Sequence, residues 1–129
     1  MKNKMIHTID LSGCRTDNAE NLEFFLQKLD KFSNIRYLTL DNMQPDLSPS
    51  LEILGEALSE NTRLEVLIMR ENRLKWIPYC QFWDNIKPNI TLKKINVSKT
   101  DLSDRVLEKL CILLENPAIT LVDLDLSRN

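Results

Sequence analysis

The residues best suited to covalent chemistry are three cysteines and one histidine. Cys14, Cys80 and Cys111 offer thiols, and a thiol nucleophile needs an adjacent base such as histidine. His7 is the only histidine, and it lies in the first apolar segment, far along the chain from Cys80 and Cys111. The sequence also contains no GxSxG, no HExxH and no phosphate-binding glycine loop. We therefore predict no catalytic residues and no enzymatic activity.

The same cysteines argue against a metal centre and a disulfide framework. Their number is odd, they are far apart in the sequence, and no two of them form a CxxC pair of the kind that binds zinc. We predict three free thiols, no metal and no cofactor. The 17 basic and 19 acidic residues give a formal net charge of -2, so no nucleic-acid partner is expected. No signal peptide and no run of about 18 apolar residues is present, which predicts a cytoplasmic protein without membrane insertion.

Apolar residues recur at a fixed period, which indicates the elements that position the rest of the chain. A short pattern opens at Ile6, Ile35, Leu64, Leu92 and Leu121, at intervals of 29, 29, 28 and 29 residues. In all five units apolar residues follow three and five positions later: Ile9 and Leu11, Leu38 and Leu40, Leu67 and Met69, Ile95 and Val97, and Leu124 and Leu126. Residues two apart share one face of a strand. We predict strands centred on 8–10, 37–39, 66–68, 94–96 and 123–125, in one parallel sheet.

Eight positions after each opening residue stand Cys14, Met43, Asn72, Thr100 and Asn129. The pattern resembles that of leucine-rich repeats, in which this position holds Asn or Cys and the side chain satisfies backbone groups of the loop; Met43 and Thr100 depart from it. Met43 is poorly suited to this bond, and Pro45 and Pro49 follow it. We therefore predict an irregular loop in the second unit.

The second half of each unit predicts a helix, because apolar residues recur there at intervals of three or four. Asp17, Ser48 and Ser103 are the expected N-caps. The apolar stripes are Leu22, Phe25, Leu26, Leu29 and Phe32; Leu51, Leu54 and Leu58; Tyr79, Phe82, Trp83 and Ile86; and Leu107, Leu110, Cys111 and Leu114. We expect the third helix to be shorter and to end near Lys87-Pro88.

The LxxLxLxxN/C pattern, with a strand and a helix in about 28 residues, resembles the leucine-rich repeat family over nearly the whole chain. The unit length is similar to the long, ribonuclease-inhibitor-like subclass. The resemblance implies an α/β solenoid, a horseshoe arc with a parallel sheet on the concave side and helices on the convex side. We expect one domain over 1–129, with repeats starting near 6, 35, 64, 92 and 121, within a longer array.

In function, the resemblance implies a protein–protein interaction module that binds a protein partner on the concave face. The alternative is a regulator of an enzyme in trans, such as a GTPase-activating-protein-like repeat domain. The expected partner-binding residues point to solvent between the core positions of the strands. They are Tyr37, Val66, Ile68, Arg70, Lys94, Asn96, Asp123 and Asp125. Tyr, Arg and aliphatic residues are common in binding hot spots, and we expect the two cations to meet acidic groups of the partner.

Two of these features have an ordinary structural interpretation. Arg70 is predicted beside Asp41 of the preceding strand, and a cross-strand ion pair is the favoured interpretation. The third unit holds four aromatic residues within eight positions, namely Trp76, Tyr79, Phe82 and Trp83. A local core is the favoured interpretation of this cluster. Trp76 is predicted in the loop before the helix, where it is a possible convex patch for a partner.

Overall fold

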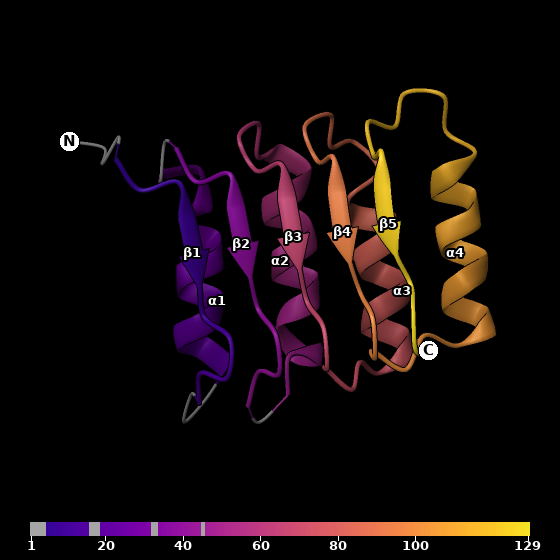
Figure 1. Ribbon diagram of the computed structural model, residues 1–129, viewed down its shortest axis with the longest axis horizontal. Helices are drawn as coiled ribbons and strands as arrows, with labels where there is room; N and C mark the ends of the chain where they lie inside the picture. The colour runs from indigo at the N-terminus through magenta and orange to yellow at the C-terminus, as the bar shows by residue number, and fades with distance from the viewer. Residues whose placement is uncertain (1–4, 16–18, 32–33, 45) are drawn as a thin grey trace.

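The computed structural model describes residues 5–15, 19–31, 34–44 and 46–129, and its central element is a five-stranded parallel sheet (Figure 1). The strands lie side by side in the order in which they occur in the chain. They are β1 (Thr8–Asp10), β2 (Tyr37–Thr39), β3 (Val66–Ile68), β4 (Lys94–Asn96) and β5 (Asp123–Asp125). All five strands coincide with the predicted segments.

The register of the sheet places the repeated apolar residues of neighbouring strands opposite one another. Leu38 of β2 lies opposite Leu67 of β3, which lies opposite Ile95 of β4. All three side chains are completely buried. Their neighbours in each strand point to the other side of the sheet, because successive side chains of a strand alternate. Leu38, Leu67 and Ile95 therefore form a buried column across the middle of the sheet.

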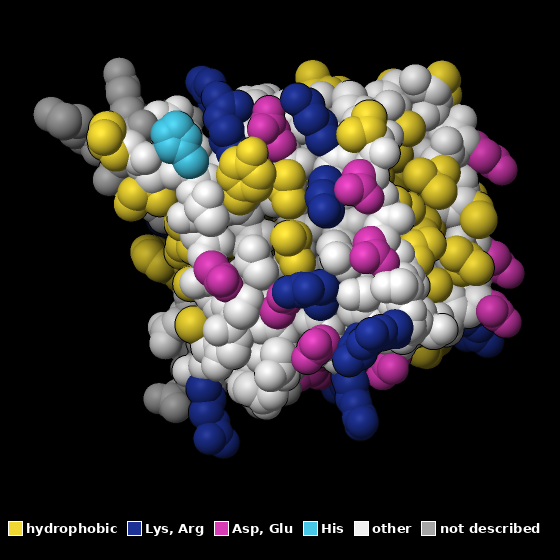
Figure 2. Space-filling view, in the orientation of Figure 1, with side chains coloured by type: hydrophobic (Ala, Val, Ile, Leu, Met, Phe, Trp, Pro, Cys, Tyr) yellow, Lys and Arg dark blue, Asp and Glu magenta, His cyan; other side chains and the backbone are white. Residues whose placement is uncertain are grey.

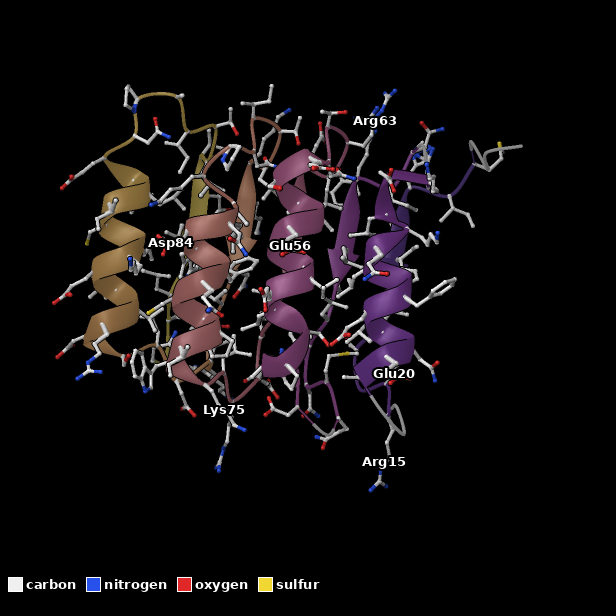
Figure 3. The ribbon with its side chains drawn as sticks, turned by 180° about the vertical axis from the view of Figure 1, so that it is seen from behind. Arg15, Glu20, Glu56, Arg63, Lys75 and Asp84 are labelled. Carbon is white, nitrogen blue, oxygen red and sulfur yellow. The ribbon has the colours of Figure 1, made fainter. Side chains whose placement is uncertain are left out.

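Helices connect the strands and cover one side of the sheet. They are α1 (Ala19–Gln27), α2 (Leu51–Glu60), α3 (Trp76–Asn85) and α4 (Asp104–Leu114), with short 3-10 helices η1 (Leu29–Lys31) and η2 (Ser48–Ser50). Seen from behind, the four α-helices stand in a row in front of the strands (Figure 3). Each packs against the next along the chain. The parallel strands need these crossover connections, since a tight hairpin cannot join parallel neighbours.

The core lies between the sheet and this row of helices. Leu26, Leu54, Phe82 and Leu110 contribute one completely buried side chain from each α-helix. Phe82 also packs edge-on against Trp83, with ring centroids 5.1 Å apart. Among the described residues, no helix is long and apolar enough to cross a membrane.

Four helix predictions need correction or fall outside the described residues. The third helix is not shorter than the second, because α3 begins already at Trp76 and has 10 residues, as many as α2. Ser48 does not cap α2; its buried hydroxyl instead accepts the Lys75 N–H at 2.9 Å, which ties two neighbouring loops together. Ser103 does occupy the N-cap position of α4 in an extended conformation, but its side chain makes no capping hydrogen bond. The predicted cap Asp17 and the stripe residue Phe32 lie outside the described residues.

The loops after the strands share one backbone geometry. Gly13, Asn42, Glu71, Lys99 and Arg128 occupy equivalent positions and all have a left-handed φ, between 47° and 71°. The second loop shares this backbone feature with the others, and Asn72 of the next loop accepts the Met43 N–H at 2.9 Å. It differs from them in continuing into the 3-10 helix η2 before α2. That the loop is irregular at Met43 stays a prediction, because Pro45 lies outside the described residues.

Asparagines also organise the opposite edge of the sheet, where the chain enters the strands. Asn89 donates to the carbonyls of Leu58 and Asn61 at 2.7 and 3.2 Å. Its side-chain oxygen accepts the backbone N–H groups of Thr91 and Leu92. Asn61 accepts two such N–H groups in the preceding connection. The sequence analysis missed this second row, although the asparagines stand three residues before Leu64 and Leu92 in each case.

Candidate functional site

The side of the sheet that no helix covers is called here the open face. Its first row is Thr8, Tyr37, Val66, Lys94 and Asp123, which are direct partners on neighbouring strands. Its second row is Asp10, Thr39, Ile68, Asn96 and Asp125. The open face continues beyond the strands at Asp41 and Arg70, which stand two residues after the ends of β2 and β3. The structure thus brings all eight residues of the predicted partner-binding set onto one surface.

An apolar centre occupies the middle of the open face and consists of Tyr37, Val66 and Ile68. Tyr37 is 43% exposed and lies directly opposite Val66, while Ile68 follows two positions along the same strand. Val66 and Ile68 are half-buried. In the space-filling view, hydrophobic side chains gather in the middle of this face and charged groups surround them (Figure 2). The sheet backbone holds these side chains in place, so a contacting molecule meets a preformed surface.

Arg70 forms the predicted cross-strand ion pair with Asp41. Its Nη2 and Nε atoms lie 2.6 and 2.9 Å from Asp41 Oδ2, and its backbone N–H donates to Asp41 Oδ1 at 2.6 Å. The hydrogen bonds to Asp41 and the negative charge of that carboxylate raise the pKa of the Arg70 guanidinium. Arg70 is half-exposed, yet two of its donors and its charge are already engaged by Asp41.

Lys94 has an acidic neighbour as well. Its Nζ atom lies 3.5 Å from Asp123 Oδ2, its partner in the first row of the open face. Both cations of the predicted binding set therefore have an acidic neighbour within the protein. That Arg70 and Lys94 also meet acidic groups of a partner stays a prediction. The Arg70–Asp41 pair was predicted from the strand spacing, whereas the Lys94–Asp123 pair was not.

Two carboxylates of the open face have hydrogen bonds but take part in none of the ion pairs among the described residues. Asp10 accepts the Ser12 N–H at 2.8 Å, and Asp125 accepts the Ser127 N–H at 2.9 Å. Hydrogen bonds from the hydroxyl and backbone of Ser12 lower the pKa of Asp10. Those from Ser127 likewise lower the pKa of Asp125. Both groups are consequently ionised at neutral pH and remain available to a cation from outside.

A second surface, called here the loop groove, lies at the edge where the strands end. It has a volume of about 960 Å³. Its lining comes from the loops after β2, β3 and β4 and from the first residues of α3 and α4. Lys75 projects from this edge (Figure 3) and lies 3.7 Å from Asp46. The groove combines acidic and basic side chains with one exposed aromatic ring.

That ring belongs to Trp76, which begins α3 rather than lying in the loop as predicted. Trp76 is 46% exposed, and the Arg105 guanidinium lies over its indole, 4.7 Å from the ring centroid. The other three aromatics of the cluster, Tyr79, Phe82 and Trp83, are completely buried, which confirms the local-core interpretation for them. Burial raises the pKa of the Tyr79 phenol, whose oxygen lies 2.8 Å from Thr100 Oγ1.

The thiols do not gather into a reactive site in the described part of the chain. Cys14, Cys80 and Cys111 are free, and burial raises the pKa of the Cys80 thiol. His7 precedes β1 at one edge of the sheet, whereas Cys80 belongs to α3. Within residues 5–15, 19–31, 34–44 and 46–129, no group of three His, Cys, Asp or Glu side chains is arranged to hold a metal ion.

Comparison with known proteins adds no assignment to this geometry. No protein-family model matches the sequence, and no curated protein matches it either. The open face and the loop groove are thus the two surfaces on which a functional proposal for this chain can rest.

Proposed function

We propose that the chain is a leucine-rich repeat module of the long, ribonuclease-inhibitor-like kind, which binds a protein partner on the open face. In this proposal the five strand–loop units form a solenoid, and the open face is its concave side. Three features support it: consecutive parallel strands, helices on one side only, and a strand register of 29, 29, 28 and 29 residues. The asparagine at the end of the LxxLxLxxN pattern also bonds as such a stack requires, as Asn72 illustrates.

The observation that carries the proposal is the apolar centre. Tyr37, Val66 and Ile68 present a tyrosine ring and two aliphatic side chains on a surface without any repeat-building duty, since the core residues point to the other side. Tyrosine is enriched in hot spots because it buries a large area with few rotatable bonds. The strands already order these side chains, so little conformational entropy is lost on binding. Charged groups around the centre match the polar rim of protein interfaces.

The test compares two doubly substituted variants of the chain. Partners are captured from a native lysate and identified. The affinity of each partner for the wild type and for Tyr37→Ala/Ile68→Ala is then measured by interferometry. We expect the double substitution to weaken binding by at least about 2 kcal/mol, roughly 30-fold. The control is Ile90→Ala/Val122→Ala, which removes two side chains that are 64% and 84% exposed and lie outside the open face. Circular dichroism and melting curves establish that each variant is folded.

The loop groove is the competing surface, because Trp76 is an exposed aromatic residue with an arginine stacked on it. Trp76→Ala is therefore measured in the same series. If Trp76→Ala abolishes binding while Tyr37→Ala/Ile68→Ala binds like the wild type, the open-face proposal is wrong and the groove is the binding site.

A further inference from the structure

We infer that the open face recognises a basic–apolar–basic segment of its partner: an extended peptide that places an apolar side chain on the apolar centre and a Lys or Arg at each end. The inference rests on the proposed function, because it names the chemistry of the partner for the same surface. It follows from the arrangement of charge along the second row of the open face.

The second row has a symmetrical layout. Ile68 stands in the middle strand, Asp10 in the first and Asp125 in the fifth. Neighbouring strands are about 4.8 Å apart, so the two carboxylates are separated by roughly 19 Å, with Ile68 roughly halfway. An extended peptide advances about 3.3 Å per residue and covers that distance in about six steps. A segment of about seven residues crossing the strands therefore reaches both carboxylates.

The net negative charge of the open face favours a partner segment with positive charges. The surface holds the carboxylates Asp10, Asp41, Asp123 and Asp125 and the cations Arg70 and Lys94, which gives a formal charge of -2. Asp41 engages Arg70 and Asp123 engages Lys94. The two remaining carboxylates stand at the two ends of the second row. Arg70 attracts both of them and Lys94 attracts Asp125, but neither cation forms an ion pair with them among the described residues. An acidic peptide or a phosphate backbone meets like charge there, whereas Lys or Arg meets an ionised acceptor.

Each of the two carboxylates has acceptor capacity left for a cation. Asp10 Oδ1 accepts one backbone N–H, from Ser12, while a carboxylate offers about four acceptor positions. Asp125 Oδ1 accepts the Ser127 N–H, and its Oδ2 atom lies 3.4 Å from Asn96 Nδ2. These bonds fix both side chains before binding. A guanidinium or ammonium group can then bind an oriented acceptor without first ordering it.

The experiment selects peptides with the wild-type protein from a phage-displayed library of random nine-residue sequences. We expect enrichment of sequences with Lys or Arg near both ends and an aliphatic or aromatic residue in the middle. Affinities of a selected peptide, labelled with fluorescein, are then measured by anisotropy against Asp10→Asn/Asp125→Asn. This substitution keeps one side-chain oxygen at each position to accept the Ser12 and Ser127 N–H groups, removes the charges, and replaces the second oxygen by an NH2 group. We expect a loss of at least about tenfold, which shrinks at high salt because charge attraction is screened.

The matched control is Glu56→Gln/Glu115→Gln, which removes the same number of charges. Glu56 lies on α2 among the helices (Figure 3), and Glu115 follows α4; both side chains are exposed. This variant should bind the peptide like the wild type.

The outcomes separate the inference from the proposed function. A selection that enriches no basic–apolar–basic sequence overturns the inference. So does a selected peptide whose binding is lost with Tyr37→Ala/Ile68→Ala but unchanged with Asp10→Asn/Asp125→Asn, a result that leaves the proposed function in place. A peptide that binds equally well to both double variants overturns the two together.

Discussion

The buried side chain of Asn72 connects two neighbouring loops, and its removal gives a direct measure of how the loops stabilise the sheet. Its Nδ2 atom donates to the carbonyls of Leu40 and Met69, each at 2.9 Å, and its Oδ1 atom accepts the Met43 N–H. Asn72→Ala leaves these three backbone groups without that partner. A buried polar group without a hydrogen bond costs about 1–3 kcal/mol. Taking the lower value for each group, we expect the free energy of unfolding to fall by about 3 kcal/mol.

Urea titration followed by circular dichroism measures this loss, and a thermal melt should show a midpoint about 10 °C lower. Cys14→Ala is the matched control, because Cys14 stands at the equivalent position after β1 but has an exposed side chain. Its stability should change by less than about 0.5 kcal/mol, as is usual for surface substitutions. If Asn72→Ala is no more destabilising than Cys14→Ala, the loop hydrogen bonds do not stabilise the fold as argued here.

Three further predictions test the core, the thiols and the open face. Leu67→Ala should lower the free energy of unfolding by about 2–5 kcal/mol, because it empties a completely buried site; an unchanged melting curve would contradict this. Cys80 should react with a maleimide more slowly than the exposed Cys111, because burial raises the pKa of the Cys80 thiol. Mass spectrometry follows the labelling of both thiols. A disulfide between Cys80 and Cys111 would refute the assignment of free thiols. Ser12→Ala should raise the pKa of Asp10 toward its ordinary value of 3.8, as measured by NMR titration. Since the folded-state pKa is lowered, the stabilisation from this carboxylate is present above pH 3.8 and disappears as the pH falls through the folded-state value. If Ser12→Ala leaves the pKa of Asp10 unchanged, the hydrogen bond from the Ser12 hydroxyl does not lower it.

Much of the fold was predictable from the sequence because the strands obey a local rule. Residues two apart share a strand face, and a pattern repeated at 29 or 28 residues places equivalent residues side by side. The centres of all five strands and the burial of Leu38, Leu67 and Ile95 agree with this rule.

The error at Ser48 falls where a neighbouring unit overrides the local signal. Ser48 was predicted to cap a helix, but its hydroxyl accepts the backbone N–H of Lys75. This partner belongs to the next loop, so the residues around Ser48 do not reveal it.

The close packing of α2 against α3 could not be predicted from the sequence either. Gly55 lies on α2, and a Cβ atom there would stand 2.9 Å from the Cβ atom of Asn85 on α3. The absence of a side chain allows the two helices to approach closely, although glycine in a helix is otherwise unfavourable. The sequence shows a glycine within a helical pattern but not the helix that it faces.

For the candidate site, the sequence by itself determined which residues share the open face, because strand alternation and a constant period are local properties of the chain. The sequence also predicted the pair of Asp41 with Arg70, whereas only the tertiary structure decided how the remaining charges are arranged. Asp41 holds Arg70 at 2.6 Å and Asp123 lies 3.5 Å from Lys94, while Asp10 and Asp125 have no such cation among the described residues. The physical reason is that an ion pair depends on side-chain distances of a few ångströms across strands, and strand period alone does not set those distances.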